Sequence, residues 1–91
     1  MRVVKETKLI GDAFFFLAAR SKSVGGATAG VESANNKNVP AKFHGEYVVT
    51  GNGGKWECTN LVRALVTLRS VRNAENLWQV KDGKRTRLAY S

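Results

Sequence analysis

The sequence predicts a small α+β domain, in which an antiparallel sheet built from hairpins packs one face against a principal helix at about residues 60–72. Two dipeptides that favour tight hairpin turns, Asn52-Gly53 and Asp82-Gly83, each lie between runs that suit strands. Between the two hairpins, apolar residues recur at helical spacing. A length of 91 residues suits one domain, so residues 1–91 are expected to form a single unit.

The N-terminal segment is compatible with two structures. The run from Arg2 to Ile10 follows neither period cleanly and is interpreted as a strand, whereas Ala13 to Ala19 is apolar throughout. The second run suits either a buried strand or a short buried helix with Asp12 as its N-cap. Three consecutive aromatic residues favour a strand, and Gly11-Asp12 could form a turn. We therefore expect a hairpin here, with the helix as the alternative.

Residues 21–38 are expected to form a flexible loop. Small and polar residues dominate this stretch, and Val24 and Val31 are its only sizeable apolar side chains. So little apolar surface cannot offset the entropy lost on ordering. The loop is either an inert insertion or a binding segment that orders on contact.

The hairpin from Phe43 to Cys58 has a register that follows from its turn. With Asn52 and Gly53 as the loop, Val49 faces Trp56 and Tyr47 faces Cys58. One face then carries mostly apolar residues, and the other carries Glu46, Val48, Thr50, Lys55 and Glu57. We therefore expect Tyr47, Trp56 and Cys58 to face the core.

The helix at about residues 60–72 is predicted from a leucine-rich stripe and a capping residue. Thr59 or Asn60 offers the side-chain oxygen for the cap. The stripe consists of Leu61, Ala64, Leu65, Leu68 and Val71. Arg69 and Arg72 are expected in the last turn, where cations favour the negative end of the helix dipole.

The closing hairpin is predicted around Asp82-Gly83. A two-residue loop places Val80 opposite Arg85, Trp78 opposite Arg87, Gln79 opposite Thr86, Leu77 opposite Leu88 and Glu75 opposite Tyr90. Leu77, Leu88 and Tyr90 would then join the core. Trp78, Val80, Arg85 and Arg87 would share the other face.

The net charge of +8 is concentrated toward the C-terminus. From Arg63 onward the chain holds seven basic and two acidic residues, which accounts for five of the eight charges. Basic clusters bind phosphate backbones through counterion release, and an exposed aromatic ring adds a stacking surface for an unpaired base. The predicted nucleic-acid contacts are Trp78, Lys81, Lys84, Arg85 and Arg87, with Lys55, Arg69 and Arg72 as secondary contacts. In the alternative interpretation, Trp78 packs under the helix and Arg87 stacks on its indole.

Several function classes are disfavoured by residues that the chain lacks. A single cysteine, Cys58, cannot form an intramolecular disulfide, and with one histidine, His44, it cannot supply a typical zinc site. We therefore expect no metal, no cofactor and a cytoplasmic location. The longest apolar run has seven residues, Ala13 to Ala19, too few to cross a membrane as a helix. The glycines around Lys55 do not match a phosphate-binding loop, because Val49 and Trp56 stand where that motif needs Gly and Ser or Thr.

These observations favour a small basic nucleic-acid-binding module, of a regulatory or accessory kind, with no predicted catalytic residue. DNA and RNA, single-stranded or duplex, stay open. The alternative is a protein-interaction module or inhibitor that docks on an acidic or nucleic-acid-handling partner. A toxin-like ribonuclease using His44 is a third hypothesis. Edge strands in so small a sheet would also allow a homodimer.

Overall fold

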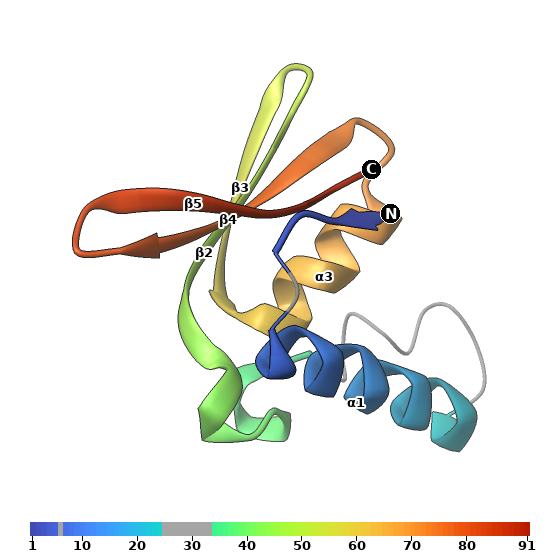
Figure 1. Cartoon of the computed structure of the whole chain (residues 1–91). Coiled ribbons are helices and arrows are strands. Elements are labelled where there is room, and N and C mark those ends of the chain that lie inside the picture. Colours follow the sequence, from blue (N-terminus) through green and yellow to red (C-terminus); the bar gives the residue numbers. More distant parts are fainter. Residues whose placement is uncertain (6, 25–33) are drawn as a thin grey trace.

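A computed structural model of the chain describes residues 1–5, 7–24 and 34–91. These residues form a five-stranded antiparallel sheet in the order β1-β5-β4-β2-β3, with α3 packed on one face and α1 packed against α3 (Figure 1). The expected α+β class, with a principal helix on one face of the sheet, is confirmed. The elements are β1 Arg2–Val3, α1 Lys8–Val24, η1 Asn36–Asn38, η2 Ala41–Phe43, β2 His44–Gly51, β3 Gly54–Asn60, α3 Leu61–Ser70, β4 Ala74–Lys81 and β5 Lys84–Tyr90.

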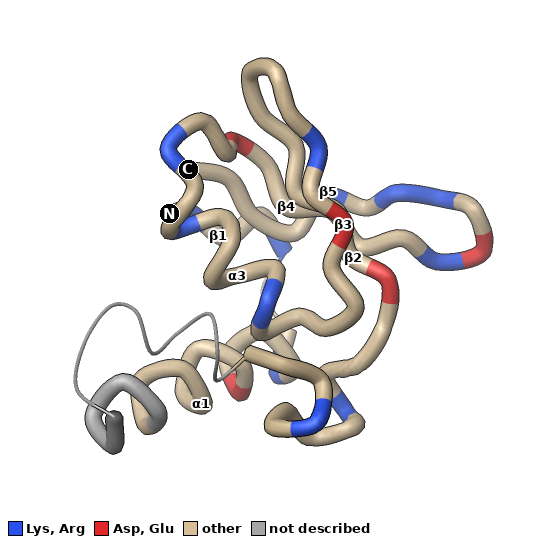
Figure 2. Tube along the Cα trace, turned by 180° about the vertical axis from the view of Figure 1, so that it is seen from behind, with Lys and Arg blue, Asp and Glu red and all other residues tan. Residues whose placement is uncertain are grey.

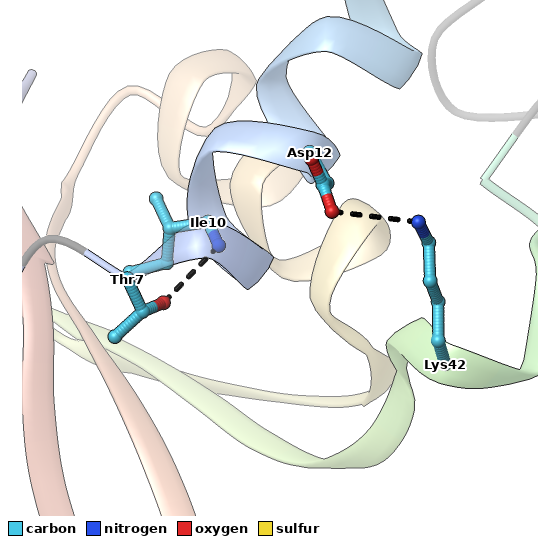
Figure 3. Close-up of polar contacts among 4 residues, drawn as sticks. All are labelled: Thr7, Ile10, Asp12 and Lys42. Carbon is cyan, nitrogen blue, oxygen red and sulfur yellow. Dashed lines mark hydrogen bonds and ion pairs between the residues drawn. The ribbon is translucent and has the colours of Figure 1, made fainter.

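The expected N-terminal hairpin is wrong, because the chain forms α1 where the second strand was predicted. Only Arg2–Val3 is a strand, and it pairs with β5. Gly11 and Asp12 lie inside α1, and the helix is capped by Thr7, whose Oγ1 accepts a hydrogen bond from the backbone N–H of Ile10 at 3.2 Å (Figure 3). Asp12 instead pairs with Lys42 at 3.4 Å, which joins α1 to η2.

The physical reason for α1 lies in which side chains of the apolar run are buried. Ile10, Ala13 and Leu17 recur at helical spacing and are buried in the core, whereas Phe15 is 77% exposed. Phe16 also packs against Phe43 of η2, with ring centroids 6.0 Å apart. An uninterrupted apolar run conceals this one-sided burial, so the period of the run could not separate helix from strand.

The segment predicted as a flexible loop at residues 21–38 is only partly described. Ser21–Val24 belong to α1, and Asn36–Asn38 form the short helix η1. Ala34 is buried in the core, and its carbonyl accepts a hydrogen bond from the side chain of Asn60 at 2.9 Å. Helical elements therefore extend into both ends of the segment predicted as a loop. Residues 25–33 lie outside the described residues.

The β2–β3 hairpin has the register that its turn predicts. Val49 pairs with Trp56, Tyr47 with Cys58, and Gly51 with Gly54. Gly53 has the positive φ of 81° that the tight turn needs. Tyr47 and Cys58 are buried, and Trp56 is half-buried against the core, as expected.

The predicted helix is present as α3, and Asn60 is its cap. The side-chain oxygen of Asn60 accepts a hydrogen bond from the backbone N–H of Arg63 at 2.6 Å. The helix ends at Ser70, earlier than expected, so Arg72 lies in the turn before β4 and only Arg69 is in the last turn. The buried side of α3 contributes Leu61, Val62, Ala64, Leu65, Val66 and Leu68 to the core.

The β4–β5 hairpin matches its predicted register near the turn and departs from it beyond Trp78. Trp78 pairs with Arg87 as expected, but Leu77 pairs with Ala89 and Asn76 with Tyr90. The irregularity between Leu77 and Trp78 places one extra residue in β5, which is a β-bulge. Leu77 and Leu88 are buried as predicted, whereas Tyr90 is not in the core.

No helix in the described part of the chain is long and apolar enough to cross a membrane.

Candidate functional site

The candidate site is the open face of the sheet, defined as the surface opposite α3. Side chains alternate along each strand, so the residues paired with Trp78 and Asn76 share their face. On β2 these are Val48 and Thr50, and on β5 they are Arg87 and Tyr90. Val48 is only 5% exposed, yet it does not belong to the core cluster. The open face therefore has a small apolar centre of its own.

Trp78 lies across this centre. Its indole N–H donates a hydrogen bond to Oγ1 of Thr50 at 2.9 Å, and Thr50 lies one strand away and diagonal to Trp78. The bond draws the indole over β2, where Val48 pairs directly with Trp78. The indole is half-buried. This placement contradicts the alternative in which Trp78 packs under the helix.

Arg87 and Tyr90 form a second contact on the open face. The guanidinium of Arg87 lies 5.3 Å from the centroid of the Tyr90 ring, and its Nη1 is 3.5 Å from Oδ1 of Asn76. Arg87 therefore stacks on Tyr90, not on the indole of Trp78 as the alternative interpretation supposed. Arg2 pairs with Tyr90 from β1, so a second arginine reaches the same corner of the face.

Further basic residues of β4 and β5 lie toward the tip of the β4–β5 hairpin. Arg85 is exposed and lies opposite Val80 on the open face. Lys81 and Lys84 pair with each other beside the turn, and Asp82 occupies the turn itself (Figure 2). We refer to Arg2, Trp78, Arg85, Arg87 and Tyr90 as the basic-aromatic cluster. Lys81 and Lys84 flank it at the tip of the hairpin.

Acidic residues occupy the opposite side of the open face. Glu57 on β3 pairs in register with Val48, and Glu46 on β2 pairs with Val80. Lys55 is on the open face, but its Nζ lies 3.6 Å from Oε1 of Glu57 in an exposed ion pair. By register, the basic side chains on this face that lie outside this ion pair belong to β5 and β1.

Two predicted secondary contacts lie away from the cluster. Arg69 belongs to α3, which packs on the other face of the sheet. Arg72 is exposed in the turn that leads from α3 into β4. The structure therefore brings together Trp78, Arg85 and Arg87 but not these two arginines.

Arg2, Thr50 and Tyr90 are site residues that the sequence did not indicate. Arg2 reaches the face only because β1 pairs with β5, and Thr50 contacts Trp78 because β2 is the neighbour of β4. A regular hairpin predicts that Tyr90 lies in the core. The bulge in β5 carries no local signal that would have corrected this assignment.

His44 has a structural contact in the described chain. Its Nε2 lies 3.1 Å from the carbonyl of Asn36 and 3.0 Å from the carbonyl of Val39, and because carbonyl oxygens only accept, the Nε2–H group donates to both. This contact holds η1 against the start of β2. The geometry accounts for His44 without assigning it a catalytic role.

Burial raises the pKa values of two side chains on the core side of the β2–β3 hairpin, Cys58 and Tyr47. Burial raises the pKa of the Cys58 thiol, an effect reduced by a hydrogen bond with Thr67 and by the charge of Arg63. Burial also raises the pKa of Tyr47, reduced by a hydrogen bond with Gln79. Both groups are therefore neutral at physiological pH. Within the described residues, no cluster of three or more His, Cys, Asp or Glu side chains could hold a metal ion.

Comparisons with protein-family models, curated proteins and solved structures found no match to this chain.

Proposed function

We propose that the chain is a small nucleic-acid-binding module that uses the open face of its sheet. The observation that carries this proposal is the position of Trp78 and Tyr90, two partly exposed aromatic residues on one face with Arg2, Arg85 and Arg87. Aromatic rings on a sheet surface accept stacked bases, and neighbouring arginines neutralise the phosphates that connect those bases. The combination favours an unpaired strand, because the bases of a duplex are already stacked on one another.

The hydrogen bond between Trp78 and Thr50 supports this proposal. It satisfies the polar N–H of the indole within the protein, so a base can stack on the ring without competing for that group. The contacts of Arg87 with Tyr90 and Asn76 hold the guanidinium on the same face. Holding the side chains in place before binding reduces the entropy lost when the ligand arrives.

Two double variants, each of which removes two positive charges, test the proposal. Arg85→Ala/Arg87→Ala removes two positive charges from the cluster, and Arg69→Ala/Arg72→Ala removes two from outside it. Binding of labelled single strands of about 12 nucleotides is measured by fluorescence anisotropy at about 50 and 200 mM salt. We expect the first variant to bind about tenfold more weakly or worse at the lower salt and to reduce the salt slope by about 1.4.

The control variant separates this site from general charge. Equal losses for the two double variants would mean that the open face is not the site. Absence of binding by the native chain to single strands and duplexes of DNA and RNA at low salt would contradict the function itself. Tighter binding to duplex than to single strands would contradict the stacking role of Trp78 and Tyr90.

A protein-interaction module is the second candidate, and one specific observation favours it. Phe15 is 77% exposed on α1 and borders an apolar groove of about 260 Å³ lined in part by Phe16, Pro40 and Phe43. Exposed aromatic side chains beside such a groove are frequent anchors for protein partners. Phe15→Ser should abolish recovery of a stoichiometric protein from nuclease-treated extract and leave nucleic-acid binding unchanged.

A further inference from the structure

We infer that β3 is the interface of a symmetric homodimer, in which two copies of β3 pair antiparallel about Trp56. The strand is at one edge of the sheet and is bonded only to β2 among the described strands. In Figure 1 the tip half of the β2–β3 hairpin stands clear of the helices. Unpaired edge strands are templates for pairing with another strand, and a second copy supplies an identical one.

The outer edge of β3 presents the backbone groups of two alternate residues, one on each side of Trp56. In a two-residue hairpin, Gly51 and Gly54 flank the turn as a hydrogen-bonded pair, and bonded pairs then alternate along the strands. This alternation directs the N–H and C=O groups of Lys55 and Glu57 away from β2. No backbone hydrogen bond from another described segment reaches either residue.

The charges on these two residues select one register. With Trp56 on the two-fold axis, Lys55 of each copy lies opposite Glu57 of the other, which gives two reciprocal ion pairs. In the single chain the same two side chains are already 3.6 Å apart, so the four charges would alternate around the axis. A shift of the strands by two residues would place Lys55 opposite Lys55 of the other copy, or Glu57 opposite Glu57 of the other copy. Like charges in directly opposite positions are unfavourable.

The groove beside the end of β3 fits the same register. A groove of about 300 Å³ lies between residues 34–36 and the second half of β3. Pairing about Trp56 would place the partner's Gly54 opposite Cys58 and its Gly53 opposite Thr59. Gly53 and Gly54 of the partner's tip would thus face the groove without side chains of their own, and the indole of Trp56 would accompany them because it lies over Gly54. The charges therefore select the register, and the groove provides space for the partner's tip beside the end of β3.

Charge reversal tests both the interface and its register. Sedimentation equilibrium of the native chain in about 150 mM salt, where the net charge of +8 is partly screened, should give a dimer. Lys55→Glu and Glu57→Lys each replace two attractive pairs by two repulsive ones, so each should weaken the dimer about tenfold or more. The double variant K55E/E57K should restore it.

Mixing the two single variants separates this arrangement from an effect within one chain. Lys55→Glu carries two acidic residues at the interface and Glu57→Lys carries two basic ones, so in the mixture the two variants should pair with each other more tightly than either pairs with itself. Circular dichroism confirms that each variant is folded. A native chain that stays monomeric up to about 0.5 mM, or a dimer that the single reversals leave unchanged, would overturn the inference.

Discussion

The indole N–H of Trp78 donates a hydrogen bond to the hydroxyl of Thr50 at 2.9 Å, which links β4 to β2 across the open face. The two residues are 28 positions apart in the sequence and meet only because the two strands are neighbours. The bond fixes the largest aromatic surface of the open face. It also offers a way to change that surface without altering any charge.

Thr50→Val should disturb the indole without removing a charged group. Valine has nearly the same shape as threonine, but it cannot accept the hydrogen bond, so the free energy of unfolding should fall by about 1 kcal/mol in urea denaturation. If the indole stacks on a base, single-strand affinity should fall severalfold while the salt slope stays constant. Thr50→Ser keeps the acceptor and is the control. A smaller salt slope for Thr50→Val would mean that the substitution also removes phosphate contacts. It would contradict the assignment of the lost affinity to stacking on the indole.

Asn60→Ala should cause a large loss of stability. Asn60 is buried; its oxygen caps α3, and its amide donates to the carbonyl of Ala34 and to Asn36. Removing a cap costs about 1 kcal/mol, and leaving a buried carbonyl without a donor costs a further 1 to 3 kcal/mol. We expect a total of about 2 to 4 kcal/mol in chemical denaturation. Thr59→Ala, at the exposed neighbouring position, should change stability by less than about 0.5 kcal/mol.

Two glycine-to-alanine substitutions should have opposite effects. A Cβ on Gly51 would collide with the backbone carbonyl of Asn73, because the β2–β3 turn passes close to the turn before β4. A Cβ on Gly11 in α1 would meet no atom within 4 Å. Gly51→Ala should therefore lower the melting temperature strongly, whereas Gly11→Ala should stabilise the protein by about 0.5 to 1 kcal/mol. A destabilising Gly11→Ala would contradict the helical assignment of this segment.

The burial of Cys58 predicts a loss of stability at alkaline pH. Because burial raises the pKa of the folded thiol above its ordinary value of 9.0, the unfolded chain ionises first as the pH rises. The stability contributed by the neutral thiol is complete below the unfolded pKa and is lost as the pH rises through the folded pKa. Unfolding free energies measured from pH 7 to 10.5 should therefore fall more steeply for the native chain than for Cys58→Ala. Parallel curves would show that the thiol does not contribute. Tyr47 is present in both proteins, so its own raised pKa affects both curves equally.

The sequence by itself determined the parts of the fold that depend on neighbouring residues. The Asn52-Gly53 and Asp82-Gly83 turns set the pairings closest to them, including Val49 with Trp56 and Trp78 with Arg87. The capping oxygen of Asn60 and the leucine stripe set α3. Backbone angles, caps and side-chain periods act over a few residues, so they can be recognised without the rest of the chain.

Only the tertiary structure decided the features that depend on distant partners. The apolar run at residues 13–19 forms a helix because one side of it packs against α3 and the core, while Phe15 on another side is exposed. The bulge in β5 moved Tyr90 to the open face, and the pairing of β1 with β5 brought Arg2 beside it. Turn residues determine pairing only up to the first irregularity, and the order of strands in a sheet depends on the burial of the whole core. The open face could therefore be anticipated from Trp78, Arg85 and Arg87, but its full composition required the folded chain.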